Sequence, residues 1–340
     1  MKPFKYGTLA AALLAAQPTL ADTTILFNNF LGSNDALWTD VLAPWIGDIE
    51  SATDGRVTFS VPAASLAPPP GLLNAVQQGV VDGAFQMVGF LRESHPELQL
   101  PLLPMTYFGN EETSVALWRT YERYFAGHND LEDVVLLGLI TTPSGSFFNM
   151  QPEPFESVED LQNVKMWSLP GVTAEALAAL GAVVTPGPAV RMYEVISGGV
   201  VDAFCCINFQ SLEVFNVAQY IGSVTEVPGS LFAPAFAIFV RQDVWDSIDP
   251  ADQEAILAVS GESLAHRGSF GELPEEAARQ RAIDAGIPVI QADDSFTQAM
   301  TDAFAPIRQD WIDSVAAHGI DGAEALDFYL SEQANVVTGN

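Results

Sequence analysis

Short apolar runs alternate with helical patterns along this chain. The strand-like runs cover residues 25–27, 57–61, 134–140, 164–167, 200–207 and 236–240. Two helix starts are marked locally: Ser157 has Asp160 three residues later, and Asp249 precedes Pro250 at a first helical position. Alternation of this kind predicts an α/β protein with largely buried sheets.

One segment occurs twice, once in each half of the chain. Residues 72–85 read LLNAVQQGVVDGAF and residues 192–205 read MYEVISGGVVDAFC. In both, a short amphipathic helix ends at a glycine, and an apolar strand with an aspartate (Asp82, Asp202) follows. The repeat predicts two similar α/β lobes, with a ligand cleft between them at the carboxyl ends of the strands. For the two aspartates themselves, a turn-capping role is favoured over ligand contact.

Residues 1–21 are typical of a secretory signal peptide. Lys2 and Lys5 precede an apolar stretch at 7–16, and Thr19-Leu20-Ala21 supplies small residues at a cleavage site. The stretch is shorter than the roughly 20 residues that span a bilayer. The mature chain would begin at Asp22, and we expect an exported, periplasmic protein.

Charge and composition exclude several classes of function. The 340 residues carry 13 basic and 43 acidic side chains, a formal charge of -30. Nucleic-acid binding is excluded because it depends on clustered Lys and Arg. The acid excess is interpreted as adaptation to high salt, which screens self-repulsion.

No enzyme signature is present in the sequence. The dinucleotide, P-loop, zinc-protease and nucleophile-elbow motifs are all missing. Four scattered histidines (His95, His128, His266, His318) lack metal-ligand spacing. We therefore expect no catalysis, no cofactor and no metal. Cys205 and Cys206 are adjacent and alone, and are interpreted as two thiols that point to opposite faces of a strand, rather than as a strained bridge.

Four segments in order resemble the solute-binding proteins of tripartite ATP-independent periplasmic (TRAP) transporters. They are residues 54–85, 156–171 (ESVEDLQNVKMWSLPG), 180–203 and 239–256 (FVRQDVWDSIDPADQEAI). The resemblance implies a two-lobed periplasmic binding protein fold with a ligand cleft between the lobes and a long connecting helix. It also implies delivery of a small-molecule ligand to one small and one large membrane subunit. We expect a monomer.

The same resemblance sets the expected domain boundaries. Residues 22–141 and about 232–270 would form lobe I, and residues 142–231 would form lobe II. Residues from about 271 to 340 would be C-terminal helices that pack across both lobes.

The expected ligand site departs from the family pattern. The family usually has a carboxylate-binding arginine where this chain has Trp167, and a second arginine of some members falls near Phe147. Phe204, Cys205 and Cys206 stand where polar ligand contacts are common. A carboxylate in a closed cleft needs charge-assisted hydrogen bonds, worth about 1.5 to 3 kcal/mol each, and an indole supplies none.

Aromatic faces instead attract cations, so the resemblance predicts an aromatic cage. Its expected rings are Trp167, Phe147, Phe204 and Phe85. The other expected ligand contacts are Met87, Cys206, Asn28 and Asn29; for the two asparagines a turn after the first strand is the alternative. Asp35 and Glu93 are both plausible as a carboxylate that pairs with an amine, and the sequence does not choose between them.

The ligand predicted from the sequence is a small organic amine, such as ethanolamine or choline. One alternative keeps the transport role with a neutral, aromatic or carboxylate ligand, since rings also stack on Trp and Phe. Another is a periplasmic sensor subunit, or an enzyme that has reused the fold.

Overall fold

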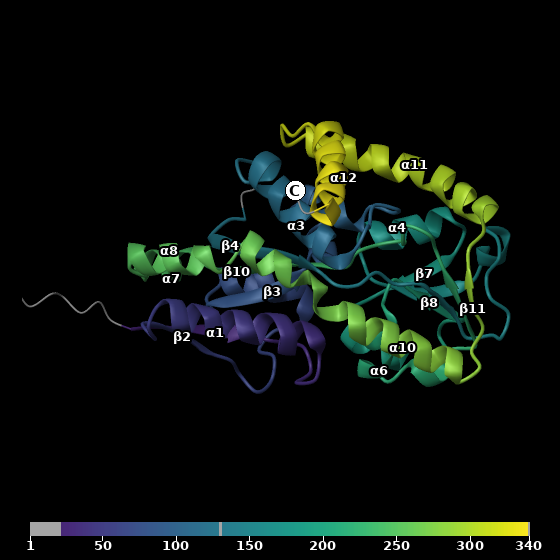
Figure 1. The fold of residues 1–340 in the computed structure, drawn as a ribbon, viewed down its shortest axis with the longest axis horizontal. Coiled ribbons are helices and arrows are strands. Elements are labelled where there is room, and N and C mark those ends of the chain that lie inside the picture. The colour runs from purple at the N-terminus through teal and green to yellow at the C-terminus, as the bar shows by residue number, and fades with distance from the viewer. Residues whose placement is uncertain (1–21, 129–130, 339–340) are drawn as a thin grey trace, which may run out of the picture.

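The computed structural model describes residues 22–128 and 131–338 and contains two β-sheets (Figure 1). The sheet of lobe I has the order β2-β1-β3-β10-β4. Its strands are β1 (Thr23–Asn28), β2 (Val57–Ser60), β3 (Gly83–Met87), β4 (Val134–Thr141) and β10 (Ala235–Arg241). β1 is parallel to β2 and β3, and β10 runs antiparallel between β3 and β4.

The sheet of lobe II has the order β11-β9-β5-β8-β6-β7. Its strands are β5 (Phe147–Asn149), β6 (Lys165–Ser168), β7 (Val183–Pro186), β8 (Ala203–Cys205), β9 (Ser223–Glu226) and β11 (Val289–Gln291). β6 is parallel to β7 and β8, whereas β5 is antiparallel to β8 and β9. Two sheets with helices on their faces confirm the predicted α/β architecture with two lobes.

Helices cover both sheets and connect the lobes. Their bounds are α1 Ala43–Ala52, α2 Leu72–Gln77, α3 Asn110–Thr120, α4 Val172–Ala179, α5 Met192–Ser197, α6 Phe209–Val214, α7 Gln242–Ser247, α8 Pro250–Ala258, α9 Glu262–Ala265, α10 Glu272–Asp284, α11 Asp294–Ala316 and α12 Gly322–Thr338. Other helical segments include the π-helix η1 (Leu37–Leu42) and the 3₁₀-helices η3 (Val88–Leu91), η4 (Pro96–Leu102) and η9 (His266–Gly271). The long helix α11 contacts α4 in lobe II and η4 in lobe I, so it bridges the lobes (Figure 1).

The segment after residue 271 is not entirely helical. β11 lies within it and extends the lobe II sheet beside β9. α12 packs on α3 of lobe I. The predicted signal peptide lies outside the described residues. Among the residues that are described, no helix has the length and apolar character needed to cross a membrane.

Both copies of the sequence repeat fold as predicted. α2 leads into β3 and α5 leads into β8, and the glycine after each helix has nearly the same positive φ, 70° at Gly79 and 68° at Gly199. Only glycine adopts this conformation without steric cost. Asp82 accepts a hydrogen bond from the Leu26 amide in β1 (3.0 Å) and forms an ion pair with Arg241 at the end of β10 (3.2 Å). Its carboxylate therefore links two strands of the lobe I sheet.

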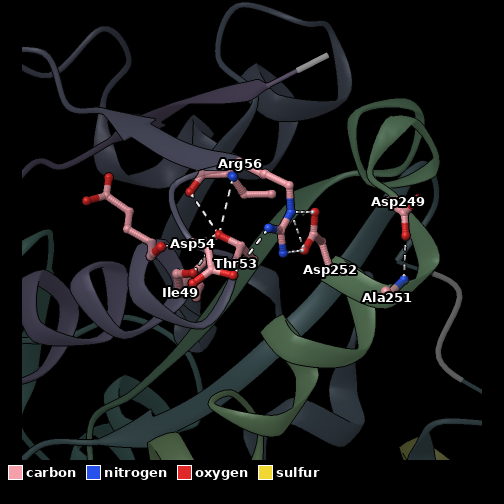
Figure 2. A network of polar contacts seen from close by, with 9 residues as sticks. Ile49, Thr53, Asp54, Arg56, Asp249, Ala251 and Asp252 are labelled. Carbon is pink, nitrogen blue, oxygen red and sulfur yellow. Dashed lines mark hydrogen bonds and ion pairs between the residues drawn. The ribbon is translucent and has the colours of Figure 1, made fainter. Parts of the chain in front are cut away.

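A polar network ties the start of β2 to α8 (Figure 2). The guanidinium of Arg56 donates to both oxygens of Asp252, with the shortest contact at 2.7 Å. Asp249 caps α8 by accepting from the Ala251 amide at 2.8 Å, as its position before Pro250 predicts. The Asp252 carboxylate is buried, whereas Arg56 is half-exposed. The ion pair therefore compensates the charge of a buried carboxylate.

Candidate ligand-binding site

A cavity of about 850 Å³, open mouth included, lies between the two lobes. Lobe I lines it with Phe30, Leu31, Asp35, Ala36 and Leu37 after β1, with Met87 at the end of β3 and Phe90 just beyond it, and with Pro69 between β2 and α2. Lobe II contributes residues after β6, β7 and β8: Leu169, Pro188, Ala189, Val190, Ile207, Asn208, Gln210, Ser211, Val214 and Phe215. Thr142, Pro143, Pro234, Phe236 and Phe270 complete the lining. The cavity is therefore at the carboxyl ends of parallel strands, where the repeat predicts the cleft.

Aromatic rings form much of the apolar wall. Phe30 stacks on Phe85 with ring centroids 4.7 Å apart, and Phe85 also contacts Phe236 at 6.0 Å. Phe85 is fully buried and supports two rings that do face the cavity. Such a wall suits a flat ring, which can stack or make edge contacts.

Asp35 is the charged side chain of this lining; no Lys, Arg or His is among the described residues around the cavity. Its carboxylate Oδ1 accepts a hydrogen bond from the Leu37 amide at 3.0 Å, at the start of η1. Burial raises the pKa of the Asp35 carboxyl, and the amides of Leu37 and Trp38 oppose that rise. Because Asp35 lines the cavity, its carboxyl oxygen can accept a hydrogen bond from a ligand donor, whereas a ligand carboxylate finds no cation among the described lining residues.

Glu275 links α10 to the helix that borders the cavity. Its carboxylate accepts from the amides of Phe209 (2.8 Å) and Gln210 (2.9 Å) at the start of α6. Asn208 caps the same helix by accepting from the Ser211 amide at 2.8 Å. Burial raises the pKa of Glu275 to about 7, the two amides lower it, and the like charges of Glu226 and Glu276 add to the rise.

This raised pKa predicts that stability falls as pH rises. A carboxyl with a higher pKa in the folded state favours folding while protonated, so its contribution is complete below its ordinary pKa of 4.5 and is lost through about 7. We expect Glu275→Gln to flatten this part of the melting-temperature profile and to be more stable than wild type above pH 7. Glu254→Gln, at an exposed position of α8 that does not contribute to the pKa of Glu275, is the matched control. Parallel profiles for wild type and Glu275→Gln would contradict the prediction.

The four rings expected to form a cage do not line this cavity. Trp167 and Phe204 are paired neighbours on β6 and β8, and Phe204 stacks on Phe148 at 5.3 Å. Phe147 packs against Phe155 and Phe296 instead. All of these cage rings are at most 1% exposed. They lie within strands, where side chains pack against the layers that cover the sheet, whereas most of the cavity lining follows the strand ends and only Met87 and Phe236 of the lining belong to strands.

The remaining expected contacts divide in the same way. Met87, the last residue of β3, lines the cavity. Asn28 is buried and bonds to Ser65 Oγ (3.0 Å) and the Leu66 amide (2.7 Å), so its amide group holds a neighbouring loop. Asn29 forms a turn by accepting from the Leu31 amide at 2.9 Å, which fits the turn alternative.

Of the two candidate carboxylates and the expected cysteine contact, only Asp35 lines the cavity. Asp35 lines the cavity, whereas Glu93 borders a different pocket beside Arg92. Cys206 is fully buried against Cys205, just before the lining residue Ile207.

Sequence reasoning missed most of the lining residues. Phe30, Phe90 and Phe236 are single aromatic residues in or near apolar segments, which gives them no distinguishing local signal. Leu169 and Ile207 follow β6 and β8 by one or two positions. A rule that counts from the last strand residue toward the following turn would have found them.

Residues 27–314 match the family described as bacterial extracellular solute-binding protein, family 7, and the chain belongs to this family. Proteins of this family are extracytoplasmic receptors of TRAP transporters, which bind small molecules and work with membrane subunits.

Proteins similar to this chain include one matched by sequence and two matched by solved structure. It is 34% identical over 334 residues to a protein of Comamonas testosteroni named outer membrane transporter protein TsaT, covering 97% of this chain and 98% of that one. A TRAP periplasmic solute-binding protein from Bordetella bronchiseptica, solved with bound (R)- and (S)-mandelate, is 29% identical with a TM-score of 0.87, over 92% and 99% of the two chains. A TRAP solute-binding protein from Rhodoferax ferrireducens, solved with benzoate, shares the fold at 20% identity and a TM-score of 0.83, over 92% and 98%.

Proposed function

We propose that this protein captures a small aromatic compound between its lobes and delivers it to the membrane subunits of a TRAP transporter. The observation that carries the proposal is the lining of the interlobe cavity: phenylalanines and aliphatic side chains with one ionisable group, Asp35. Mandelate, which is bound by the 29% identical protein, contains an aromatic ring and so supports the proposal of an aromatic ligand. A small aliphatic amine, the ligand predicted from the sequence, has no such support.

The polar group of the ligand is proposed to be a hydrogen-bond donor, such as an alcohol, phenol, amide or ammonium. A buried carboxylate without charge-assisted donors is destabilised by its lost hydration. The cavity offers Asp35 as an acceptor and the neutral residues Thr142, Asn208, Gln210 and Ser211, with no cation among the described residues that line it. An aromatic acid is the second candidate, because mandelate is bound by a similar protein.

A thermal-shift and calorimetry panel tests this function. It compares benzyl alcohol, benzamide, benzylamine, benzoate and mandelate, which share a ring, with ethanolamine and choline, which have none. A ligand at 100 times its dissociation constant stabilises the protein by about 2.7 kcal/mol. Stabilisation by ring compounds alone supports the aromatic site. Stabilisation by choline without any ring compound would overturn it.

Asp35→Asn separates the two ligand classes. We expect the substitution to weaken binding of a donor-bearing ring compound by about tenfold or more, since it removes a hydrogen bond to a charged group. The same change should improve benzoate or mandelate binding by removing a like charge. Asp40→Asn, on the exposed side of η1, is the control and should leave both unchanged. Unaltered affinities in Asp35→Asn would contradict a ligand-facing role.

A further inference from the structure

The two cysteines of the chain are in direct contact. Cys205 ends β8, and Cys206 leaves the strand with a φ of 73°. In a continuous strand their side chains would point to opposite faces, as the sequence suggested. The left-handed conformation of Cys206 turns its side chain back, and the two Sγ atoms lie 2.6 Å apart. The expectation of two thiols on opposite faces is therefore wrong.

The surroundings of the pair leave few uses for two free thiols. Both side chains are fully buried, so neither is presented to a substrate. Burial and the neighbouring Cys205 raise the pKa of the Cys206 thiol, which keeps it protonated and unreactive in the folded protein. Within the part of the chain that the structure describes, no group of three or more His, Cys, Asp or Glu side chains could hold a metal.

We propose that Cys205 and Cys206 are a modification site: they form a disulfide between neighbouring residues in the exported protein. The extracytoplasmic location of the family supplies a compartment in which disulfides form and persist. This inference goes beyond ligand transport and holds whichever ligand the cavity takes.

The chemistry needs an oxidant that itself carries a disulfide, such as an oxidised dithiol protein of the same compartment. One cysteine thiolate attacks that disulfide, forms a mixed disulfide and releases one thiolate of the oxidant. The second cysteine thiolate then attacks the mixed disulfide, closes the Cys205–Cys206 bond and releases the oxidant in its reduced form. The two thiols lose two protons and two electrons, and the oxidant gains them. Because both sulfurs are buried in the folded state, the reaction precedes the completion of folding.

The bond would fix a turn at the edge of the ligand cavity. Ile207 and Asn208, which follow directly, line the cavity, and Asn208 also caps α6. The Cys206 amide donates to the Ser146 carbonyl at 3.3 Å, so the turn also rests on the segment that crosses between the lobes. A disulfide at this point restrains both the cavity wall and the crossing segment.

The test uses the full chain exported to the periplasm with its own N-terminal segment and purified without reductant. The protein is denatured in excess alkylating reagent and weighed, with and without prior reduction. We expect no alkylation before reduction and two labels per chain after it. The mass of the unreduced, unlabelled chain should be lower by two hydrogens than the mass calculated for the chain with two free thiols. Two labels without reduction would overturn the proposal, as would a disulfide-linked dimer on a non-reducing gel.

Two variants make the result specific. Cys206→Ser should take one label without reduction, which shows that the reagent reaches an unpaired thiol at this place. The double variant Cys205→Ser with Cys206→Ser should melt at the same temperature with and without reductant, whereas wild type should melt lower when reduced. A wild-type melting temperature that reduction leaves unchanged would overturn the role of the bond in fixing the turn.

Discussion

Gly145→Ala is expected to lower the free energy of unfolding by about 3 kcal/mol or more. Gly145 lies where the chain crosses from β4 in lobe I to β5 in lobe II. A methyl group there would lie 2.6 Å from the carbonyl carbon of Cys206, and closer still to the backbone N and O of Ile207. These are backbone atoms of the turn beside the cavity, so they cannot move aside as a flexible side chain would. Chemical denaturation measures the loss.

Gly47→Ala is the matched control for that substitution. Gly47 lies inside α1, and an added methyl group would meet nothing within 4 Å. Because alanine favours helix more than glycine does, we expect Gly47→Ala to stabilise the protein by about 0.5 to 1 kcal/mol. If Gly145→Ala unfolds at the same denaturant concentration as wild type, the crossing segment is less tightly packed than the structure indicates.

Gly89→Ala is expected to weaken ligand binding by about tenfold or more, with little change in the folding of either lobe. Gly89 belongs to η3 in lobe I, and its missing methyl group would lie 2.5 Å from the carbonyl oxygen of Pro170 in lobe II. The contact is next to the cavity residues Phe90 and Leu169. A methyl group there should hold the lobes apart, and a ligand bound between the lobes would lose contacts made by both of them.

Calorimetry with the best-binding ring compound of the panel measures this effect, and small-angle scattering shows whether the variant stays more open. Gly127→Ala, at an exposed position where a methyl group meets nothing within 4 Å, should bind as wild type does. Wild-type affinity in Gly89→Ala would mean that binding does not require the two lobes to approach at Pro170.

The architecture was predictable because its signals are local. Each copy of the repeat has its own helix pattern and its own glycine at the end, and Gly79 and Gly199 adopt the positive φ that such an ending requires. Asp249 before Pro250 likewise specifies the start of α8 within three residues. Signals of this kind do not depend on the rest of the fold.

The cavity could not be predicted in the same way because it is assembled from distant segments. Phe30, Phe90 and Phe236 become neighbours only when β1, β3 and β10 pair, and their sequence context resembles that of core residues. Trp167, at the family position, packs inside lobe II while Leu169, two residues on, faces the cavity, and a ligand contact of Trp167 stays a prediction. Asp35 was one of two candidates that only tertiary structure could separate.

Lys165, the first residue of β6, is exposed on lobe II, and no other lysine follows Lys5 in the sequence. An amine-reactive dye would therefore attach to one side chain of the described chain, without any engineered site. The α-amino group has a lower pKa than a lysine, so the pH of the reaction distinguishes the two amines. Because the native cysteines are buried, a cysteine introduced on the surface of lobe I could carry a second dye. Energy transfer between the dyes would then report the distance between the lobes in solution.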